Sequence, residues 1–541
     1  MTATDLLNLE LSTLQLGLAL AGLGLVYLAI KYHDRGVGVS RRPDLETRKG
    51  WPLIGNLPEI YANRTALQEL WIKAHKEAKH PEKFLSMTAP GRRIIDITRP
   101  DLLQFVQKDG FRHFVKGEMF HENMKDILGD GIFNVDGALW HTQRKATARA
   151  FTGNSFRGVI TNSIDSHMQK LVEIVKRHAE SGQELHLDKL FFRFTLETFG
   201  SMAFGLDIGA LDPDNDEPVP FAEAFDHAQE LLDRRFNDPF WKINEKLSSR
   251  GREMKAAQKV LDDFCYKVID QRSSKGLGNE TKDTLKEDKS GTLDLLSIYM
   301  SLNAQDGKPL NRKQLRDALL NLIIAGRDTT AQALSWTFYF LLKQKHDRGE
   351  DWITKVRQEL DSSGLVDYDS FRSLPVTNAV FNAALLRQPS VPKNGWQAIS
   401  DVQMPDGPFV KAGDFVFWSD WRMARDESIW GDAAHKYSPE LFLKTSETGE
   451  LEKKEYSQWQ NHVFNGGYRL CLGQDLAKYE AVSVLAVLFK DFEFDFADDY
   501  LEKVEKMQSE DTPRYRPSLT LPMNEPLRVV VRRRQTTGAK S

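Results

Sequence analysis

Helical spacing of apolar residues runs through most of the chain and is interrupted by a few short runs typical of strands. Arg92–Thr98 and Arg528–Arg534 are two such runs, rich in Ile or Val. Two polar stretches, Leu211–Pro220 and Ser273–Gly291, are typical of exposed loops, because helical patterns of similar character continue on both sides. We find no internal repeat. The pattern predicts a mainly α fold with small β-sheets.

The longest helical pattern extends from Asn311 to Gln344 and would span about 50 Å as one helix. Asn311 is suited to cap its first turn. Near the middle, Ala325 and Gly326 reduce side-chain bulk, and the Thr329 hydroxyl can bond back to a helix carbonyl. We therefore expect a single long helix with a kinked groove at these residues.

The N-terminal segment lacks the separation of polar and apolar faces found elsewhere. Leu11–Ile30 carries no charge and would reach about 30 Å as a helix, the thickness of the hydrocarbon core of a bilayer. A secretory signal would need a basic start and a small-residue cleavage site, and a buried core helix would keep a polar stripe; the segment shows neither feature. Acidic residues precede it and basic residues follow it: Asp5 and Glu10, then Lys31, Arg35, Arg41, Arg42, Arg48 and Lys49. The positive-inside rule places the chain beyond it in the cytosol.

This segment divides the chain into four expected parts. Residues 1–10 would be a lumenal N-terminus, 11–30 a transmembrane anchor, 31–56 a basic hinge rich in Pro and Gly, and 57–541 one large domain. The hinge ends in the sequence GWPLIGN, Gly50–Asn56, where Pro and Gly favour a fixed turn over a continuing helix.

Composition excludes some functions and directs attention to one cysteine. The chain has 73 basic and 77 acidic residues, a net charge of -4, so no surface for a polyanion such as nucleic acid is indicated. It has only two cysteines, which argues against a disulfide framework. Cys265 lies in an amphipathic helical pattern and is expected to be buried. Cys471 lies in a glycine-rich loop and requires a different explanation.

The loop around Cys471 has the composition of a thiolate site beneath a flat macrocycle. The sequence FNGGYRLCLGQ, Phe464–Gln474, fits the pattern F-x-x-G-x-R-x-C-x-G at every specified position. Gly467 and Gly473 allow the backbone to approach the macrocycle, and Arg469 can meet a propionate. A buried structural cysteine in a tight turn is the alternative interpretation.

A helical pattern begins directly after this loop, so Cys471 should precede a helix N-terminus. Backbone N–H groups at that end, such as those of Leu472 and Gly473, can stabilise a thiolate. The arrangement favours metal ligation by Cys471.

The loop resembles the haem loop of the cytochrome P-450 superfamily, and two further motifs occur in the order found in that family. Ala325–Thr330 is similar to its oxygen-binding element, A/G-G-x-D/E-T-T. Trp140 and Arg144 form W-x-x-x-R, whose spacing puts both on one helix face. Taken alone, this pair is also a common packing arrangement.

The resemblance implies a fold, a cofactor and a set of site residues. The fold would be the P-450 fold, mainly α with a long central helix, and the cofactor haem b with an axial thiolate to iron from Cys471. Thr329 would manage dioxygen, and Asp328 would relay protons from solvent. The expected haem contacts are Cys471, Arg469, Phe464, Gly467, Gly473, Trp140, Arg144, Ala325 and Gly326.

One family feature is missing. P-450 proteins nearly always carry a charged triad, E-x-x-R on a helix and an Arg in a later segment, that braces the haem loop. Here Ala383, Leu386 and Leu441 stand at those places. Replacing all members of a buried charge cluster by apolar residues can be neutral, whereas losing one member is costly. We therefore expect these three residues to converge in one apolar cluster beneath the cysteine loop, and haem affinity to be the property at risk. Trp396 also replaces an Arg that often contacts a propionate, and Lys393 is a candidate substitute.

Three segments narrow the resemblance to the fungal and plant fatty-acid and alkane chain-end hydroxylases: Phe120–Trp140, Phe236–Ile243 and Ala325–Phe338. This branch implies insertion of one oxygen atom from O2 into a C–H bond of a lipophilic substrate. It also implies electrons from NADPH through a separate membrane-bound reductase, and a location in the endoplasmic reticulum membrane with a cytosolic catalytic domain. Lys145 and Arg149 are candidates for docking the acidic reductase, with solvated charge as the alternative.

Two other functions stay open from the sequence. One is oxidation of a terpenoid or polyketide in secondary metabolism, and the other is a catalytically silent haem-binding protein that has lost its brace. Pocket candidates are Phe114, Phe120, Met124, Asn321 and Ile324, and ordinary core packing would explain each of them equally well.

Overall fold

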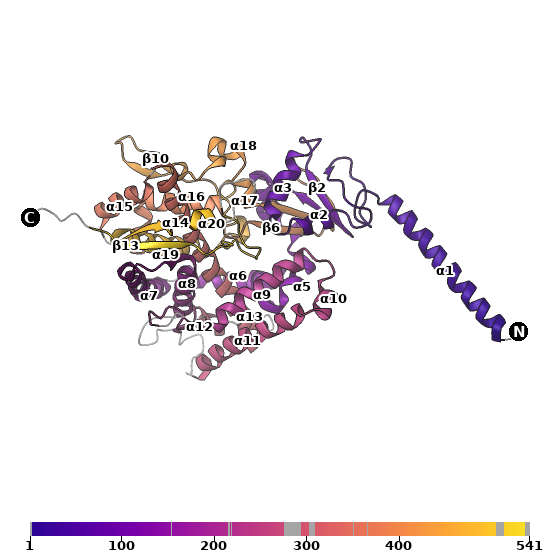
Figure 1. Cartoon of the computed structure of the whole chain (residues 1–541), viewed down its shortest axis with the longest axis horizontal. Coiled ribbons are helices and arrows are strands. Elements are labelled where there is room, and N and C mark those ends of the chain that lie inside the picture. The colour runs from indigo at the N-terminus through magenta and orange to yellow at the C-terminus, as the bar shows by residue number, and fades with distance from the viewer. Residues whose placement is uncertain are drawn as a thin grey trace, which may run out of the picture. The chain divides into compact units, whose positions relative to one another are not determined.

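The computed structural model describes residues 3–152, 154–214, 217, 219–274, 294–301, 309–349, 351–364, 366–504 and 513–535. Within its helices, the side chains of residues 3–14, 149–150, 152, 154–156 and 348 are outside the description. The chain divides into two compact units (Figure 1). The first unit comprises the residues up to Val115 and Asn394–Trp418, and the second comprises Lys116–Lys393 and the residues from Ser419 onward. The expected loop at 273–291 lies almost entirely outside the described residues, as does part of the loop at 211–220.

The first unit is built on a mixed sheet of six strands in the order β1-β2-β3-β9-β6-β4. Trp71 on α3 stacks on Phe417 of β9, with ring centroids 4.7 Å apart, and covers a small apolar core. The elements of this unit are α1 (Ala3–Lys31), β1 (Glu46–Thr47), α2 (Leu57–Ala62), α3 (Leu67–Lys76), β2 (Leu85–Ala89), β3 (Arg92–Asp96), α4 (Pro100–Gln104), η1 (Phe105–Asp109), η2 (Phe111–His113), β4 (Phe114–Val115), β6 (Lys393–Ala398), β7 (Val402–Gln403), β8 (Phe409–Val410) and β9 (Phe415–Ser419). The strand expected at Arg92–Thr98 is therefore confirmed as β3.

The fixed turn expected at Gly50–Asn56 is also confirmed. Gly55 has a positive φ of 62°, and a Cβ there would lie 2.2 Å from the carbonyl oxygen of Thr88. Asn56 and Thr88 then exchange two hydrogen bonds, of 2.7 and 2.9 Å. Glycine is required because the turn presses directly against strand β2.

The segment expected to be a membrane anchor belongs to α1. In the part of the chain that the structure describes, no helix is both long and apolar enough to cross a membrane. The anchor at Leu11–Ile30 stays a prediction.

The second unit is mostly helical (Figure 1). Its elements are α5 (Gly117–Leu128), α6 (Gly137–Thr152), α7 (Asn154–Ser181), β5 (Leu185–His186), α8 (Leu187–Phe204), α9 (Pro220–Phe236), α10 (Trp241–Leu247), α11 (Arg250–Ser274), α12 (Leu295–Met300), α13 (Arg312–Ile323), η3 (Ile324–Asp328), α14 (Thr329–Arg348), α15 (Trp352–Ser363), η4 (Phe371–Ser373), α16 (Pro375–Arg387), α17 (Asp420–Met423), α18 (Glu427–Trp430), η5 (Gly431–His435), η6 (Pro439–Phe442), β10 (Leu443–Thr445), β11 (Leu451–Lys453), η7 (Gly467–Arg469), α19 (Gln474–Asp491), β12 (Phe492–Phe496), α20 (Tyr500–Lys503) and β13 (Arg528–Arg533). A mainly α fold with small sheets is thereby confirmed, and the strand expected at Arg528–Arg534 is β13, the middle strand of β12-β13-β5.

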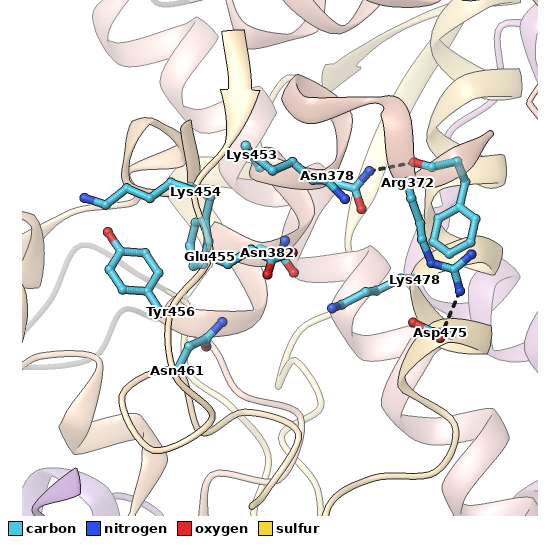
Figure 2. Close-up of a pocket in the computed structure, with 13 residues that line it drawn as sticks. Arg372, Asn378, Asn382, Lys453, Lys454, Glu455, Tyr456, Asn461, Asp475 and Lys478 are labelled. Atoms are coloured by element: carbon cyan, nitrogen blue, oxygen red, sulfur yellow. Dashed lines mark hydrogen bonds and ion pairs between the residues drawn. The ribbon is translucent and has the colours of Figure 1, made fainter. Parts of the chain in front are cut away.

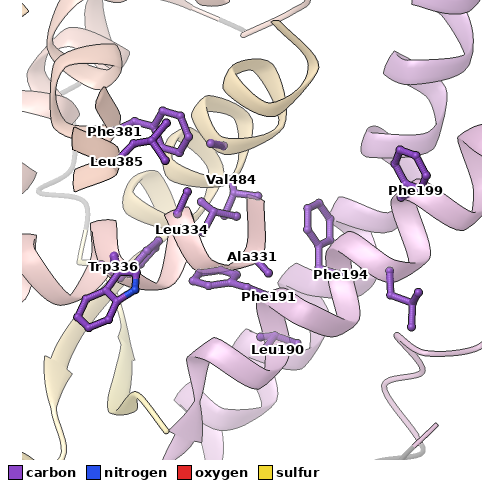
Figure 3. Packing of buried hydrophobic residues seen from close by; sticks show 14 of the residues in the cluster. Leu190, Phe191, Phe194, Phe199, Ala331, Leu334, Trp336, Phe381, Leu385 and Val484 are labelled. Atoms are coloured by element: carbon purple, nitrogen blue, oxygen red, sulfur yellow. The ribbon is translucent and has the colours of Figure 1, made fainter. Parts of the chain in front are cut away.

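Helix α14 is the centre of this unit and packs against α8, α16 and α19. Figure 3 shows Ala331 and Leu334 of α14 among Phe191 of α8, Leu385 of α16 and Val484 of α19. All of these side chains are buried, so each neighbouring helix contributes apolar area to one continuous core. The core fixes the relation between the helix that follows the cysteine loop and the long central helix.

The prediction of one uninterrupted α-helix from Asn311 to Gln344 is wrong in the middle of that range. Asn311 does cap it, with a reciprocal capping box to Gln314 at 2.9 and 3.0 Å. Between α13 and α14, however, η3 forms one π-helical turn, and α14 continues to Arg348. The Thr329 hydroxyl donates to the carbonyl of Ala325 at 2.7 Å. The expected irregularity is therefore present, and its form is a π-turn, a feature that often marks functional sites.

Candidate functional site

The cysteine loop ends at the N-terminus of α19, as the sequence predicts. The Cys471 N–H donates to the carbonyl of Phe464 at 2.8 Å, and Gly467 holds a positive φ of 58°. Gly473 is the residue before α19, and a Cβ there would meet no atom closer than 3.9 Å. The backbone therefore passes the sulfur closely without filling the space beside it.

The two cysteines have different environments. Cys265 is fully buried on α11, and burial raises the pKa of its thiol to about 12. Cys471 keeps accessible surface although protein surrounds it. Withdrawal from water raises the pKa of the Cys471 thiol, while a hydrogen bond from the Gly473 N–H and the charges of Arg144 and Lys478 lower it. The net effect is a raised pKa, and the N–H donor and the two cations act against burial in favour of the thiolate, the form that binds a metal.

Helix α6 and the stretch before it join the cysteine loop through two arginines. Arg144 donates to the carbonyl of Leu470. Arg469 donates to Asp136 at 2.8 Å, and its guanidinium lies 4.5 Å from the ring centroid of Trp140. The structure thus brings together Trp140, Arg144 and Arg469, as the motifs imply. Asp136 belongs to no motif, and its contact with Arg469 appears only in the structure.

Lys116 adds a third cation that sequence reasoning missed. Its ammonium lies 4.3 Å from the centroid of the Phe120 ring, and burial followed by repulsion from Arg469 lowers its pKa to about 7. Burial likewise lowers the pKa of Arg469, to about 10, and that of Arg144. Asp136 is the carboxylate that offsets these charges. A desolvated excess of cations fits a group that carries two carboxylates, such as the propionates of haem.

The π-turn contains a buried carboxyl group that is connected to the surface through other charged groups. Asp328 accepts hydrogen bonds from Gln229 at 2.6 Å and from Arg327 at 2.9 Å. Burial raises the pKa of Asp328 to about 6 against the lowering effect of Arg327. Arg327 also pairs with Asp226 at 2.5 Å, and the Asp226 side chain is 38% exposed. A chain of charged groups therefore connects the carboxyl beside Thr329 with solvent.

Helix α8 links this turn to α19. The Thr195 hydroxyl donates to the carbonyl of Arg327 at 2.9 Å, and Thr198 donates to Glu480 on α19 at 2.6 Å. A Cβ on Gly326 would lie 1.9 Å from the Phe199 ring. Gly326 is therefore needed for close packing of α8, a reason for glycine that the motif does not reveal.

Glu480 gives a stability prediction. Burial raises the pKa of its carboxyl from 4.5 to about 8, with only the Thr198 hydroxyl opposing. The folded protein holds this proton more tightly than the unfolded chain. The contribution of Glu480 to the free energy of unfolding is therefore fully present below pH 4.5 and is lost as the pH rises to about 8. In the wild type, this group should lower the free energy of unfolding by an amount on the order of 4 kcal/mol between pH 5 and 9, as measured by urea unfolding. Glu480→Gln should abolish that decrease. The exposed Glu502→Gln is the control, and parallel pH curves for wild type and Glu480→Gln would refute the prediction.

The residues that replace the family's charged triad lie where the sequence analysis expects an apolar cluster. Ala383 and Leu386 on α16 are buried in the main core, Leu441 on η6 packs against it, and α16 packs on η6. All three therefore belong to the main apolar core, and their convergence beneath the cysteine loop stays a prediction. The neighbouring Arg387 donates to the carbonyl of Ala434 at 2.6 Å. Lys393, the candidate propionate ligand, instead lies 3.3 Å from the buried Asp233.

A single charge should not be tolerated in this cluster. We expect Ala383→Glu to destabilise the protein by about 3–5 kcal/mol, because its carboxylate would be buried and Arg387, the cation four residues on, is already bonded to the carbonyl of Ala434. Asn382→Glu is the matched control, since Asn382 lines a pocket with Lys453 and Lys478. Thermal unfolding compares the two, and equal midpoints would show that the cluster accommodates charge.

The structure places the substrate-pocket candidates in different packing environments, and their contact with a substrate stays a prediction. Met124 is buried, and Phe120 contacts Phe236 of α9 with ring centroids 5.6 Å apart. Asn321 is fully buried and donates to the carbonyl of Leu128 at 2.8 Å while accepting from the N–H of Phe133. Asn321 therefore holds the loop before α6. Phe114 packs on Phe105 within the first unit, and Ile324 is buried in η3.

The fold, the cysteine loop and its cationic surroundings define a haem-thiolate protein. The chain belongs to the cytochrome P450 family, since the model for Cytochrome P450 matches residues 45–516. It is therefore an oxidoreductase that incorporates oxygen, with thiolate-bound haem iron as cofactor.

Three relatives document the match. Cytochrome P450 monooxygenase cyp1 of Mycosarcoma maydis is 40% identical over 520 residues, which cover 94% of this chain and 78% of the relative. Cytochrome P450 704B1 of Arabidopsis thaliana is 29% identical, covering 90% of this chain and 94% of its own. Cytochrome P450 86B1 of the same plant is 34% identical, with coverage of 72% and 70%.

Proposed function

We propose that this P450 hydroxylates long alkyl chains of fatty-acid-like substrates, taking electrons from NADPH through a separate membrane-bound reductase. The overall reaction converts a C–H bond, O2, two protons and two electrons into an alcohol and water. When bound, haem supplies the activation of dioxygen and the insertion into the C–H bond. The protein's residues hold that cofactor, exclude water and deliver protons.

Each proposed role rests on a contact described above. The thiolate of Cys471 would hold the iron, with the Gly473 N–H directed at the sulfur. Lys116, Arg144 and Arg469 would bind the two carboxylates of the cofactor. The Thr329 hydroxyl would hydrogen-bond to dioxygen. Asp328 would deliver protons that enter from solvent near Asp226. The single observation that carries the reaction type is this buried acid and alcohol beside a π-turn in a protein with a loop-end thiolate.

An apolar contact supports the lipophilic substrate. The Phe120–Phe236 pair joins two of the three segments whose sequences resemble the chain-end hydroxylases. Arg235 fixes the same helices, because it bonds to Asp126 on α5 at 2.6 Å and to Glu245 on α10 at 2.7 Å. An aromatic contact between α5 and α9 suits an alkyl chain better than a polar ligand.

A binding panel tests the substrate class. Purified haem-loaded protein is titrated with saturated fatty acids of increasing chain length and with terpenoids, and the haem Soret band is recorded. We expect fatty acids to shift the band with an optimum chain length, and to raise NADPH consumption and alcohol formation in the presence of reductase. A shift produced by terpenoids alone would contradict the proposal.

We also propose attachment to the endoplasmic reticulum membrane by one N-terminal helix, with the catalytic domain in the cytosol. In support, α1 exposes a run of large apolar side chains: Leu16, Leu18, Leu20, Leu23, Leu25, Val26, Tyr27 and Ile30. Lys145 is exposed on α6 and available to a reductase, while the side chain of Arg149 lies outside the described residues. Carbonate extraction and protease protection test the attachment. Release of the full chain by carbonate would refute it.

A further inference from the structure

A small pocket lies between α16, the start of α19, η4, the end of β11 and the segment that follows it (Figure 2). Its volume is about 250 Å³. Drug-sized ligands occupy cavities of about 300–1,000 Å³, so this pocket suits a smaller molecule. Polar and charged side chains line it: Arg372, Asn378, Asn382, Lys453, Lys454, Glu455, Tyr456, Asn461, Asp475 and Lys478.

Cations outnumber carboxylates in this lining. Arg372 and Asp475 satisfy each other, with a 2.9 Å hydrogen bond. Lys453 and Lys478 remain, and within the described part of the chain neither ammonium has a hydrogen bond or ion pair. Burial lowers the pKa of Lys478, and the charges of Lys453 and Arg372 lower it further, while the carboxylates of Asp475 and Glu455 offset part of this effect. Two ammonium groups therefore face the same space without an anion bonded to either.

Amide groups complete the lining. In Figure 2 the Lys453 and Lys478 side chains extend from different sides toward the space beside Asn378 and Asn382, whereas Lys454 points away. Asn378 is fixed, since it donates to the carbonyls of Phe371 and Leu374 at 2.8 Å. The Asn382 side chain makes no hydrogen bond to any described residue, so its donors remain available.

We propose that this pocket binds a small phosphate-type oxyanion. Two ammonium groups and an amide present donors from three elements, which is the arrangement that a multiply charged oxyanion requires. The pocket is too small for an extended acidic peptide, and its lysines are half-buried, so a free anion fits better than a protein surface. This site is separate from the proposed reaction, and its occupancy is measurable without turnover.

Occupancy should stabilise the cysteine loop. Lys478 lies on the helix that starts three residues after Cys471, and its ammonium is 5.2 Å from the Phe464 ring of that loop. Asn382 directly precedes Ala383, in the cluster that replaces the family's charged triad. An anion held between Lys453 and Lys478 would connect α19 with the end of β11 and reinforce an otherwise apolar brace. We therefore expect slower loss of haem when the pocket is filled.

The test is a titration of the full-length haem-loaded protein with inorganic phosphate, at constant ionic strength maintained with chloride. Calorimetry and the transfer of haem to apomyoglobin provide two readouts. We expect saturable binding of one phosphate and at least twofold slower haem transfer. The double variant Lys453→Gln/Lys478→Gln should bind at least tenfold more weakly. The matched control Lys255→Gln/Lys259→Gln on exposed positions of α11 should bind like wild type. A parallel titration with glycerol 3-phosphate distinguishes free phosphate from a phosphomonoester.

A second variant separates binding from folding. Asn382→Glu places a carboxylate beside the two lysines, so the folded protein should retain haem well without phosphate and lose its response to phosphate. Three results would overturn the proposal. They are no saturable binding of phosphate at constant ionic strength, unchanged phosphate binding in the double lysine variant, or a double lysine variant that changes only the affinity for the reductase.

Discussion

Replacing Cys471 with serine is expected to abolish the thiolate-type band in the reduced carbon monoxide difference spectrum and to lower substrate oxidation by about three orders of magnitude or more. Such a loss corresponds to about 4 kcal/mol of activation free energy. The physical reason is that a hydroxyl is a much weaker donor to iron than a thiolate. The loop would otherwise be preserved, because the Cys471 N–H bonds to the Phe464 carbonyl through the backbone.

Cys265 supplies the control for this experiment. It is fully buried on α11 and its thiol stays protonated, so Cys265→Ala should keep the band and cost only packing energy. The decisive measurement is the difference spectrum of both variants at equal haem content. A thiolate-type band in Cys471→Ser would assign the ligand to another residue.

Features set by local sequence could be predicted well. The N-cap at Asn311, strands β3 and β13, the turn at Gly55 and the start of α19 all follow from residues that are neighbours in the chain. Their determinants are hydrogen-bonding side chains, β-branched runs and glycine, which act within a few positions. Local rules did not give the π-turn at η3, because α8 defines that turn through bonds and packing from a distant part of the chain.

The residues of the candidate site likewise fall into those that the sequence identifies and those that only the folded structure reveals. Motif spacing identifies Arg469, Trp140 and Arg144, and the structure brings them together with the cysteine loop. Lys116 and Asp136 have no motif of their own, since their significance lies in the balance of charge around Arg469. A charge balance is a property of three-dimensional neighbours, and only the folded structure reveals the cationic excess that suits two propionates.

The missing triad shows how a departure from a family pattern can be interpreted physically. Ala383, Leu386 and Leu441 stand at the places of all three charged residues, and all three belong to the main apolar core. Arg387, the nearest remaining cation on α16, is bonded to backbone carbonyls of η5 instead. Apolar packing and backbone contacts therefore occupy the region where the resemblance implies side-chain ion pairs.

Replacing Asp328 with asparagine is expected to lower product formation by about 100-fold, within the range for loss of a general acid. An amide keeps the hydrogen-bonding shape toward Gln229 but cannot exchange a proton. Burial raises the pKa of Asp328 to about 6, so the protonated fraction declines tenfold per unit above that pH. Where proton delivery limits the rate, wild-type product formation should fall as pH rises from 6 to 8, whereas Asp328→Asn should be slow and nearly independent of pH. A wild-type profile that is flat over this range would remove Asp328 from the proton path.

Thr329→Val separates the alcohol from the acid. It removes the hydroxyl that donates to the Ala325 carbonyl, so NADPH consumption should continue while the yield of alcohol per NADPH falls at least fivefold. Thr337→Val is the matched control, because Thr337 makes the same bond to the carbonyl four residues earlier on α14, at 2.6 Å, in the buried core. Loss of a back-bonded hydroxyl alone would affect both variants equally. Only a direct part in oxygen chemistry predicts uncoupling at Thr329 with normal coupling at Thr337.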